Sequence, residues 1–174
     1  MNKIAQTTLY AAILSGLLLS ACGNQASLAD NGQGAANGHH EHEHERTSSG
    51  DLQEKTSSLK TLPAFLDSAS RDIVAAYRTA ATVTDILPYI PCYCGCGESA
   101  GHRSNLDCFI AEIGEDGSVV WDDHGTRCGV CMEIAVTAAA MKASGIETER
   151  IRALIDDTYK EGYAKPTDTL LPSA

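Results

Sequence analysis

The chain has 174 residues, a formal net charge of −10 at pH 7 and only 5% aromatic residues. This acidic balance argues against nucleic acid as a partner and against electrostatic attraction to anionic lipid head groups. The length allows one small domain, and a core so poor in aromatic residues is expected to need disulfides or a metal as additional support.

Residues 1–21 are predicted to be a lipoprotein signal peptide. Lys3 is the only charge before an apolar run from about Leu9 to Leu19, which is shorter than the ~20 residues of a membrane-spanning helix. The following "LSAC" resembles a bacterial lipobox, which implies cleavage before Cys22 and lipidation of its sulfur with diacylglycerol, with palmitate as an acyl chain. The alternative is an ordinary signal peptide. We expect a location on the extracytoplasmic face of a bacterial cell membrane.

Residues 22–61 are predicted to be the lipidated cysteine and a flexible tether, because they are rich in Gly, Asn, Ser and charge and hold few large apolar side chains. Four of the six histidines lie in the stretch "HHEHEHE". Alternating imidazoles and carboxylates on a flexible chain are expected to contact metal ions loosely, with a solvated spacer as the alternative. The predicted contacts are His39, His40, His42 and His44.

Residues 62–165 are predicted to form the folded domain, followed by a C-terminal tail over 166–174. Leu66, Ala69, Ile73 and Tyr77 follow at helical spacing, which predicts a first helix that begins near Pro63. A short helical turn is expected to end near residue 88. Prolines and glycines exclude regular helix over residues 91–97.

The second half of the domain is predicted to contain a β-hairpin and two helices. Alternation over residues 109–113, the turn "EDGS" and the return over 119–121 are typical of a hairpin. A buried helix is expected over about residues 127–144, with Thr126 as N-cap and Gly145 after its end, and an amphipathic helix over residues 147–163. The fold class is therefore expected to be mainly α, with one short hairpin and a cysteine-rich loop.

Six further cysteines lie within forty residues of this domain: Cys92, Cys94, Cys96, Cys108, Cys128 and Cys131. An even number in an exported domain is compatible with three disulfides. Cysteines two residues apart fit disulfide geometry poorly, because their α-carbons are too far apart and their side chains run parallel in an extended chain. The same spacing suits chelation of one soft ion, so metal ligation is favoured over disulfide bracing.

Cys128 and Cys131 form a C-x-x-C at the start of a predicted helix, where the helix dipole stabilises thiolates. Thiolates favour copper(I) and zinc. Copper(I) is the first choice of ion, and zinc in a closed structural site is the second. The third interpretation is a thiol–disulfide oxidoreductase that uses this pair, but the sequence around it lacks the βαβ pattern of thioredoxin-like folds.

His102 and His124 each lie in a loop that leads into a cysteine, and both are candidate ligands. The alternative for each is a surface loop residue. Asp107, Asp122 and Asp123 are interpreted as solvated turn residues, with orientation of a histidine as their alternative role.

The stretches "IPCYCGCG", "GHRSNLDCFI" and "HGTRCGVCMEIA" resemble the bacterial PCYCGC-motif lipoproteins over about residues 62–162. The resemblance implies an envelope lipoprotein with a cysteine-rich site and supplies no activity.

The prediction is therefore a lipid-anchored protein, not an enzyme, that binds a soft metal ion for handling or transfer. It is expected to contact the membrane through its lipid. Another envelope metalloprotein is a candidate partner. A disulfide-braced adaptor is the remaining alternative.

Overall fold

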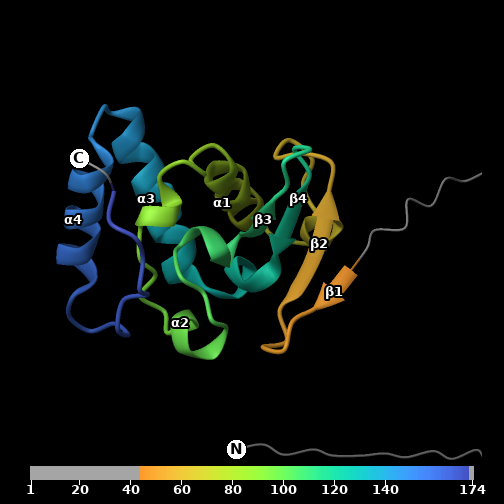
Figure 1. Cartoon of the computed structure of the whole chain (residues 1–174), viewed down its shortest axis with the longest axis horizontal. Coiled ribbons are helices and arrows are strands. Elements are labelled where there is room, and N and C mark those ends of the chain that lie inside the picture. The colour runs from red at the N-terminus through yellow and green to blue at the C-terminus, as the bar shows by residue number, and fades with distance from the viewer. Residues whose placement is uncertain (1–43, 173–174) are drawn as a thin grey trace, which may run out of the picture. The chain divides into compact units, whose positions relative to one another are not determined.

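The computed structural model describes residues 44–172 (Figure 1). The predicted signal peptide, Cys22, His39, His40 and His42 lie outside these residues. Within the described range, strands in the order β1-β2-β4-β3 form one sheet that is antiparallel at every pairing. Their bounds are β1 His44–Arg46, β2 Leu52–Thr56, β3 Ile110–Ile113 and β4 Val119–Asp122.

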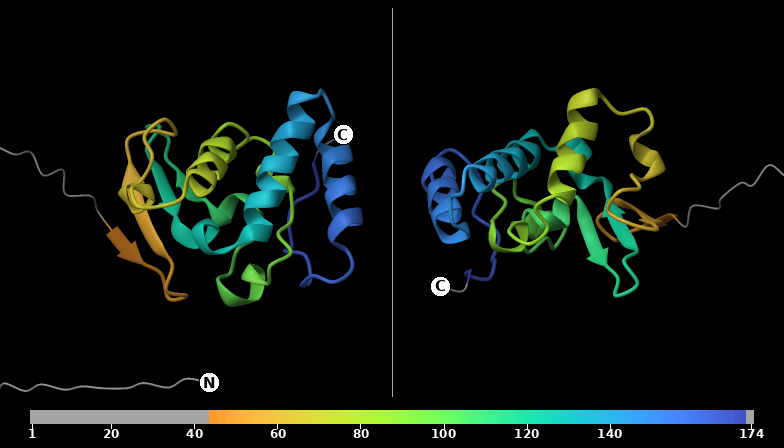
Figure 2. Two further views of the ribbon diagram at one scale, coloured as in Figure 1. Left: turned by 180° about the vertical axis from the view of Figure 1, so that it is seen from behind. Right: turned by 90° about the horizontal axis from the view of Figure 1, so that it is seen from above.

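The helices lie to one side of this sheet, and the fold is mixed α/β, so the expected mainly α class is wrong. Helices α1 and α3 pack against each other between the sheet and α4, and α3 also contacts α4 (Figures 1 and 2). Their bounds are α1 Arg71–Ala81, α2 Cys96–Ser99, α3 Gly129–Ala143 and α4 Thr148–Tyr159.

Strands β1 and β2 lie inside the predicted tether, which corrects that prediction for residues 44–61. Strand β2 pairs with β4, and its Leu52 backbone N–H donates to the Asp123 carboxylate at 2.8 Å. The buried Glu54 carboxylate accepts hydrogen bonds from the backbone N–H groups of Ala64 at 2.7 Å and Phe65 at 3.3 Å. Long-range polar contacts therefore order a segment that has few apolar side chains to bury.

The predicted first helix is divided into two pieces. A 3₁₀ turn spans Ala64–Leu66, and α1 begins only at Arg71, because the Ser70 hydroxyl accepts from the Ile73 N–H at 3.3 Å as an N-cap. The predicted turn near residue 88 is a 3₁₀ turn over Leu87–Tyr89.

The predicted hairpin is confirmed as β3 and β4, with a register shift between Ile110 and Glu112. The two predicted C-terminal helices are confirmed as α3 and α4. The buried residues of α4 are Ile151, Ile155 and Tyr159.

The core joins the sheet to α1 through three buried aromatic side chains. The Tyr77 ring centroid lies 5.0 Å from that of Phe109 and 6.2 Å from that of Trp121. The Tyr77 hydroxyl donates to the backbone oxygen of Asp122 at 2.6 Å, and the Trp121 indole N–H donates to Thr56 at 2.8 Å. These contacts fix the end of β4, which leads through a 3₁₀ turn over Asp123–Arg127 to Cys128.

The predicted C-terminal tail packs against the first cysteine. The Cys92 N–H donates to the Thr167 hydroxyl at 2.9 Å, and the Thr167 N–H donates to the Cys92 oxygen at 3.0 Å. The Ala164 N–H donates to the Tyr93 oxygen at 3.1 Å. Residues 164–167 thus hold the backbone of the cysteine segment in place.

Over residues 44–172, no helix has both the length and the apolar character needed to cross a bilayer.

Candidate metal centre

Three sulfur atoms form the centre of the cysteine-rich region. The Cys92 Sγ lies 3.1 Å from Cys131 Sγ and 3.4 Å from Cys94 Sγ, and the third edge, Cys131 to Cys94, is also 3.4 Å. Cys92 and Cys94 come from the loop before α2, whereas Cys131 comes from the first turn of α3. The fold therefore brings together thiols that are 37 to 39 positions apart in the sequence.

Cys96 and Cys108 extend this cluster on one side. Their sulfurs are 3.7 Å apart, and both residues are buried. Cys96 begins α2 and follows Gly95, whose φ of +88° is a conformation that side chains other than glycine rarely adopt. That left-handed residue turns the chain between Cys94 and Cys96, so both sulfurs of the C-x-C reach the cluster.

Cys128 occupies a different place from the other cysteines. It is the N-cap of α3, and its Sγ accepts a hydrogen bond from the Cys131 N–H at 3.5 Å. The predicted Thr126 cap is therefore wrong; the Thr126 hydroxyl instead donates to the Asp123 oxygen at 2.6 Å. The Cys131 sulfur faces Cys92 and Cys94 across the cluster.

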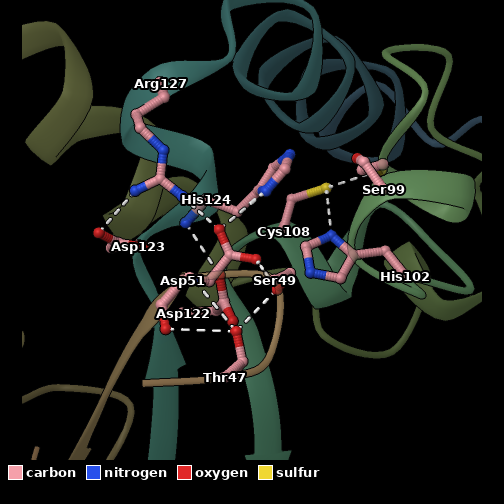
Figure 3. Close-up of polar contacts among 12 residues, drawn as sticks. Thr47, Ser49, Asp51, Ser99, His102, Cys108, Asp122, Asp123, His124 and Arg127 are labelled. Atoms are coloured by element: carbon pink, nitrogen blue, oxygen red, sulfur yellow. Dashed lines mark hydrogen bonds and ion pairs between the residues drawn. The ribbon is translucent and has the colours of Figure 1, made fainter. Parts of the chain in front are cut away.

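Both predicted histidines lie near cysteines of the cluster, and Figure 3 shows His102 and His124 on either side of Cys108. The His124 Nε2 is 4.0 Å from Cys94 Sγ, and the His102 Nδ1 is 3.4 Å from Cys108 Sγ. The two imidazole rings meet edge to face, with centroids 4.7 Å apart. The structure thus places His102 and His124 together with the thiols, although they come from different loops.

Asp51 orients His124, and sequence reasoning missed it. The His124 Nδ1 lies 3.2 Å from Asp51 Oδ1, and Arg127 forms an ion pair with the same buried carboxylate (Figure 3). A carboxylate on one imidazole nitrogen directs the other nitrogen toward its ligand. Asp51 lies in the segment assigned to the tether, and no local pattern there distinguishes it from a solvated acid.

The charges around His124 reinforce this arrangement. Contact with Cys94, followed by Asp51, raises the pKa of His124 in spite of its partial burial. Burial alone would raise the pKa of Asp51, but hydrogen bonds with Ser49 and His124 and the charge of Arg127 lower it, so Asp51 is an anion at neutral pH.

The thiols share their protons unequally. Hydrogen bonding with Cys108, followed by Cys131, lowers the pKa of Cys92 to about 4. Contacts with Cys108 and Cys128 lower the pKa of Cys94 and raise that of Cys131. The protonation of each thiol therefore depends on its neighbours, and a metal ion that binds the sulfurs would release protons from the cluster.

The three predicted turn aspartates hold backbone and side chains in place. The Asp107 carboxylate accepts from the Arg103 N–H at 2.7 Å, and that of Asp122 accepts from the His124 N–H at 2.9 Å. Asp123 forms an ion pair with Arg127 at 2.7 Å. None of these three contacts involves an imidazole ring. His44, the fourth member of the predicted loose metal tract, lies in β1 with its Nδ1 3.6 Å from Glu54.

The sulfur atoms are gathered closely enough to form a ligand set for a soft ion: the 3.7 Å pair Cys96–Cys108 matches tetrahedral spacing, and the Cys92–Cys94–Cys131 triangle, at 3.1 to 3.4 Å, would widen slightly around an ion. All six cysteines of the described domain are free thiols, and separations of 3.1 to 3.7 Å exceed the ~2.05 Å of a disulfide. A tetrahedral ion with bonds of ~2.3 Å holds its sulfurs about 3.8 Å apart. Two sets of four residues each bring their potential ligand atoms within 4.8 Å of one another. The first set is Cys92, Cys94, Cys96 and Cys131, and the second is Cys96, Cys108, His124 and Cys131.

The fold and this site define a cysteine-rich α/β domain with a cluster of thiols that could bind a metal ion. The family model described as a protein of unknown function with PCYCGC motif matches residues 11–172. The chain belongs to this family, as the resemblance in its motifs implied. No curated protein and no solved structure matches the chain.

Proposed function

We propose that this protein binds a soft metal ion, with copper(I) as the first choice, and handles or transfers it at the cell envelope. The observation that carries the proposal is the triangle of Cys92, Cys94 and Cys131, whose edges measure 3.1 to 3.4 Å. Thiolates select copper(I) over harder ions, and the triangle offers three such ligands at one place.

The burial of the cluster is uneven, which favours transfer. Cys92, Cys96, Cys108 and Cys131 are buried, whereas Cys94 is half-buried. An ion could therefore enter or leave at Cys94, where a thiol of an envelope metalloprotein could replace one ligand. Zinc in a closed structural site is the second candidate, because four buried sulfurs match the enclosed character of such sites.

The contacts of Cys128 and Cys131 favour a role in metal binding over redox catalysis by this C-x-x-C pair. The Cys131 Sγ contacts Cys92 and Cys94, and Cys128 caps the helix. The sheet is antiparallel at every pairing, so the described domain offers no parallel βαβ unit of the thioredoxin type. This geometry favours metal binding over thiol–disulfide exchange at Cys128 and Cys131.

Protein purified anaerobically from the envelope should contain a bound soft metal. Most of the six domain thiols should resist alkylation until a strong chelator is added, because metal-bound thiolates are poor nucleophiles. Elemental analysis and mass spectrometry of the alkylated protein measure both quantities. Intact disulfides without metal would overturn the proposal and leave a disulfide-braced adaptor. Copper in the analysis would support transfer, and zinc would support the structural alternative.

We also propose that lipid on Cys22 anchors the protein to the extracytoplasmic face of the membrane. The motif "LSAC" motivates this, and residue 22 is followed by a polar stretch. Cys22→Ala should release the protein into the soluble fraction or leave it unprocessed, as shown by fractionation and intact mass. Ser20→Ala, in the same motif, keeps the acceptor sulfur and should stay membrane-bound. A Cys22→Ala protein that is processed normally and remains in the membrane would contradict the anchor.

A further inference from the structure

The two sets of potential ligands overlap in a specific way. Cys96 and Cys131 belong to both sets, whereas Cys92 and Cys94 belong only to the first and Cys108 and His124 only to the second. A single tetrahedral ion uses four ligands, so it would leave two of these six ligand groups without a metal. Two tetrahedra that share one edge use all six groups.

We propose that the centre holds two soft metal ions bridged by the sulfurs of Cys96 and Cys131, which rests on the proposed metal-binding function. A thiolate sulfur has several lone pairs, so it can bind two ions at once. Cys92 and Cys94 complete the shell of the first ion. Cys108 and His124 complete the shell of the second.

Distances within the cluster agree with this division. On the first side, Cys92 and Cys94 are 3.4 Å apart, and both lie within 3.4 Å of the shared Cys131. On the second side, Cys108 lies 3.7 Å from the shared Cys96. Across the two sides, the Cys94 Sγ and the His124 Nε2 are 4.0 Å apart, so the two shells would lie side by side.

Charge and burial also favour two ions. The four buried sulfurs have hydrogen-bonding contacts with one another, with Cys94 and with His102, and they lie in a core where an uncompensated thiolate is costly. Two cations offset twice the negative charge that one cation offsets. This allows more of the thiols to ionise while they remain buried.

The two positions differ chemically. Four sulfurs surround the first, whereas the second includes the imidazole that Asp51 orients through a 3.2 Å contact. Imidazole binds both zinc and copper, so the second position discriminates less strongly by softness. Because each position also has two ligands of its own, loss of a ligand specific to one position should remove that ion and retain the other.

The test is the number of ions bound by the full chain under anaerobic conditions. Copper(I) is supplied as its acetonitrile complex, a weak chelator removes loosely held ions, and native mass spectrometry counts those that remain. The wild type should hold two. Cys92→Ser and Cys108→Ser should each hold one, and the Cys92→Ser/Cys108→Ser double variant should lose both. Cys128→Ser is the matched control, because Cys128 belongs to neither set, and it should hold two.

The outcomes separate three statements: the proposed metal binding, the pair of ions and the shared sulfurs. One ion in the saturated wild type would overturn the pair of ions while the proposed metal binding stands, and no ion would overturn both. If two ions were bound but X-ray absorption showed no metal–metal shell, the bridging by the sulfurs of Cys96 and Cys131 would be overturned. The wild-type count does not depend on the variants, so a variant that fails to fold, as judged by circular dichroism, leaves the test intact.

Discussion

Cys131→Ser is expected to abolish tight metal binding. Its sulfur is completely buried, lies 3.1 Å from Cys92 and 3.4 Å from Cys94, and belongs to both sets of potential ligands. Loss of an outer-shell partner typically lowers metal affinity about 10–100-fold, and loss of a direct ligand common to both sets should exceed this. Competition with a chromophoric chelator, at matched protein concentration, measures the change.

Cys128→Ser is the control for this experiment. It removes a thiol three residues away on the same helical turn, but a serine hydroxyl can replace its role as N-cap of α3. We expect metal affinity within a few-fold of the wild type and unchanged helix content. Equal losses in the two variants would show that the C-x-x-C acts as one unit and that the sets of ligands are drawn wrongly.

Gly125→Ala is expected to be the most destabilising single methyl addition near the site. Gly125 is buried, and an added Cβ would lie 2.8 Å from the Phe109 ring and 2.9 Å from the Cys108 backbone oxygen. Neither neighbour can move without disturbing the core or the cluster, so we expect a loss of about 3 kcal/mol in the free energy of unfolding. The midpoint of thermal unfolding should fall by roughly 10 °C, as measured by circular dichroism in one metal state.

Gly129→Ala adds the same methyl group four residues later. Gly129 is the first residue of α3, and a Cβ there would meet nothing within 4 Å. Alanine is a better helix former than glycine, so this variant should be equal to the wild type or more stable by up to about 1 kcal/mol. If both variants lost equal stability, the cause would lie in backbone conformation and not in the contact with Phe109.

The residues of the candidate metal centre were predictable where the spacing of cysteines in the sequence itself limits their chemistry. The C-x-C-x-C, the C-x-x-C and the two histidines before cysteines all gave candidates that the fold brings together. The spacing did not reveal which sulfurs are neighbours, because Cys92 meets Cys131 only through the packing of α3 against the loop before α2. It also did not distinguish Cys128, whose role as a cap depends on where α3 begins.

The sheet was the least predictable part of the fold. Strand β2 reads "LQEKT", with two adjacent opposite charges and one large apolar residue. Its order comes from pairing with β4 and from the buried Glu54, which caps a turn ten residues later. Composition favours a tether for such a segment, since local sequence does not encode these long-range partners. The same limitation concealed Asp51, whose partner His124 is 73 positions away.

The hydrogen bonds between Cys92 and Thr167 join the first cysteine of the candidate site to a residue near the end of the described chain. Thr167 follows Cys92 by 75 positions and supplies both a hydroxyl and a backbone N–H to it. A ribosome or export channel releases the chain in order, so the first cysteines emerge well before the residues that hold them. During that interval the thiols are exposed to oxidants and to stray ions. We therefore expect the proposed metal loading to follow chain release, and nascent chains shorter than about 170 residues to require reductant or a chaperone to keep their cysteines free.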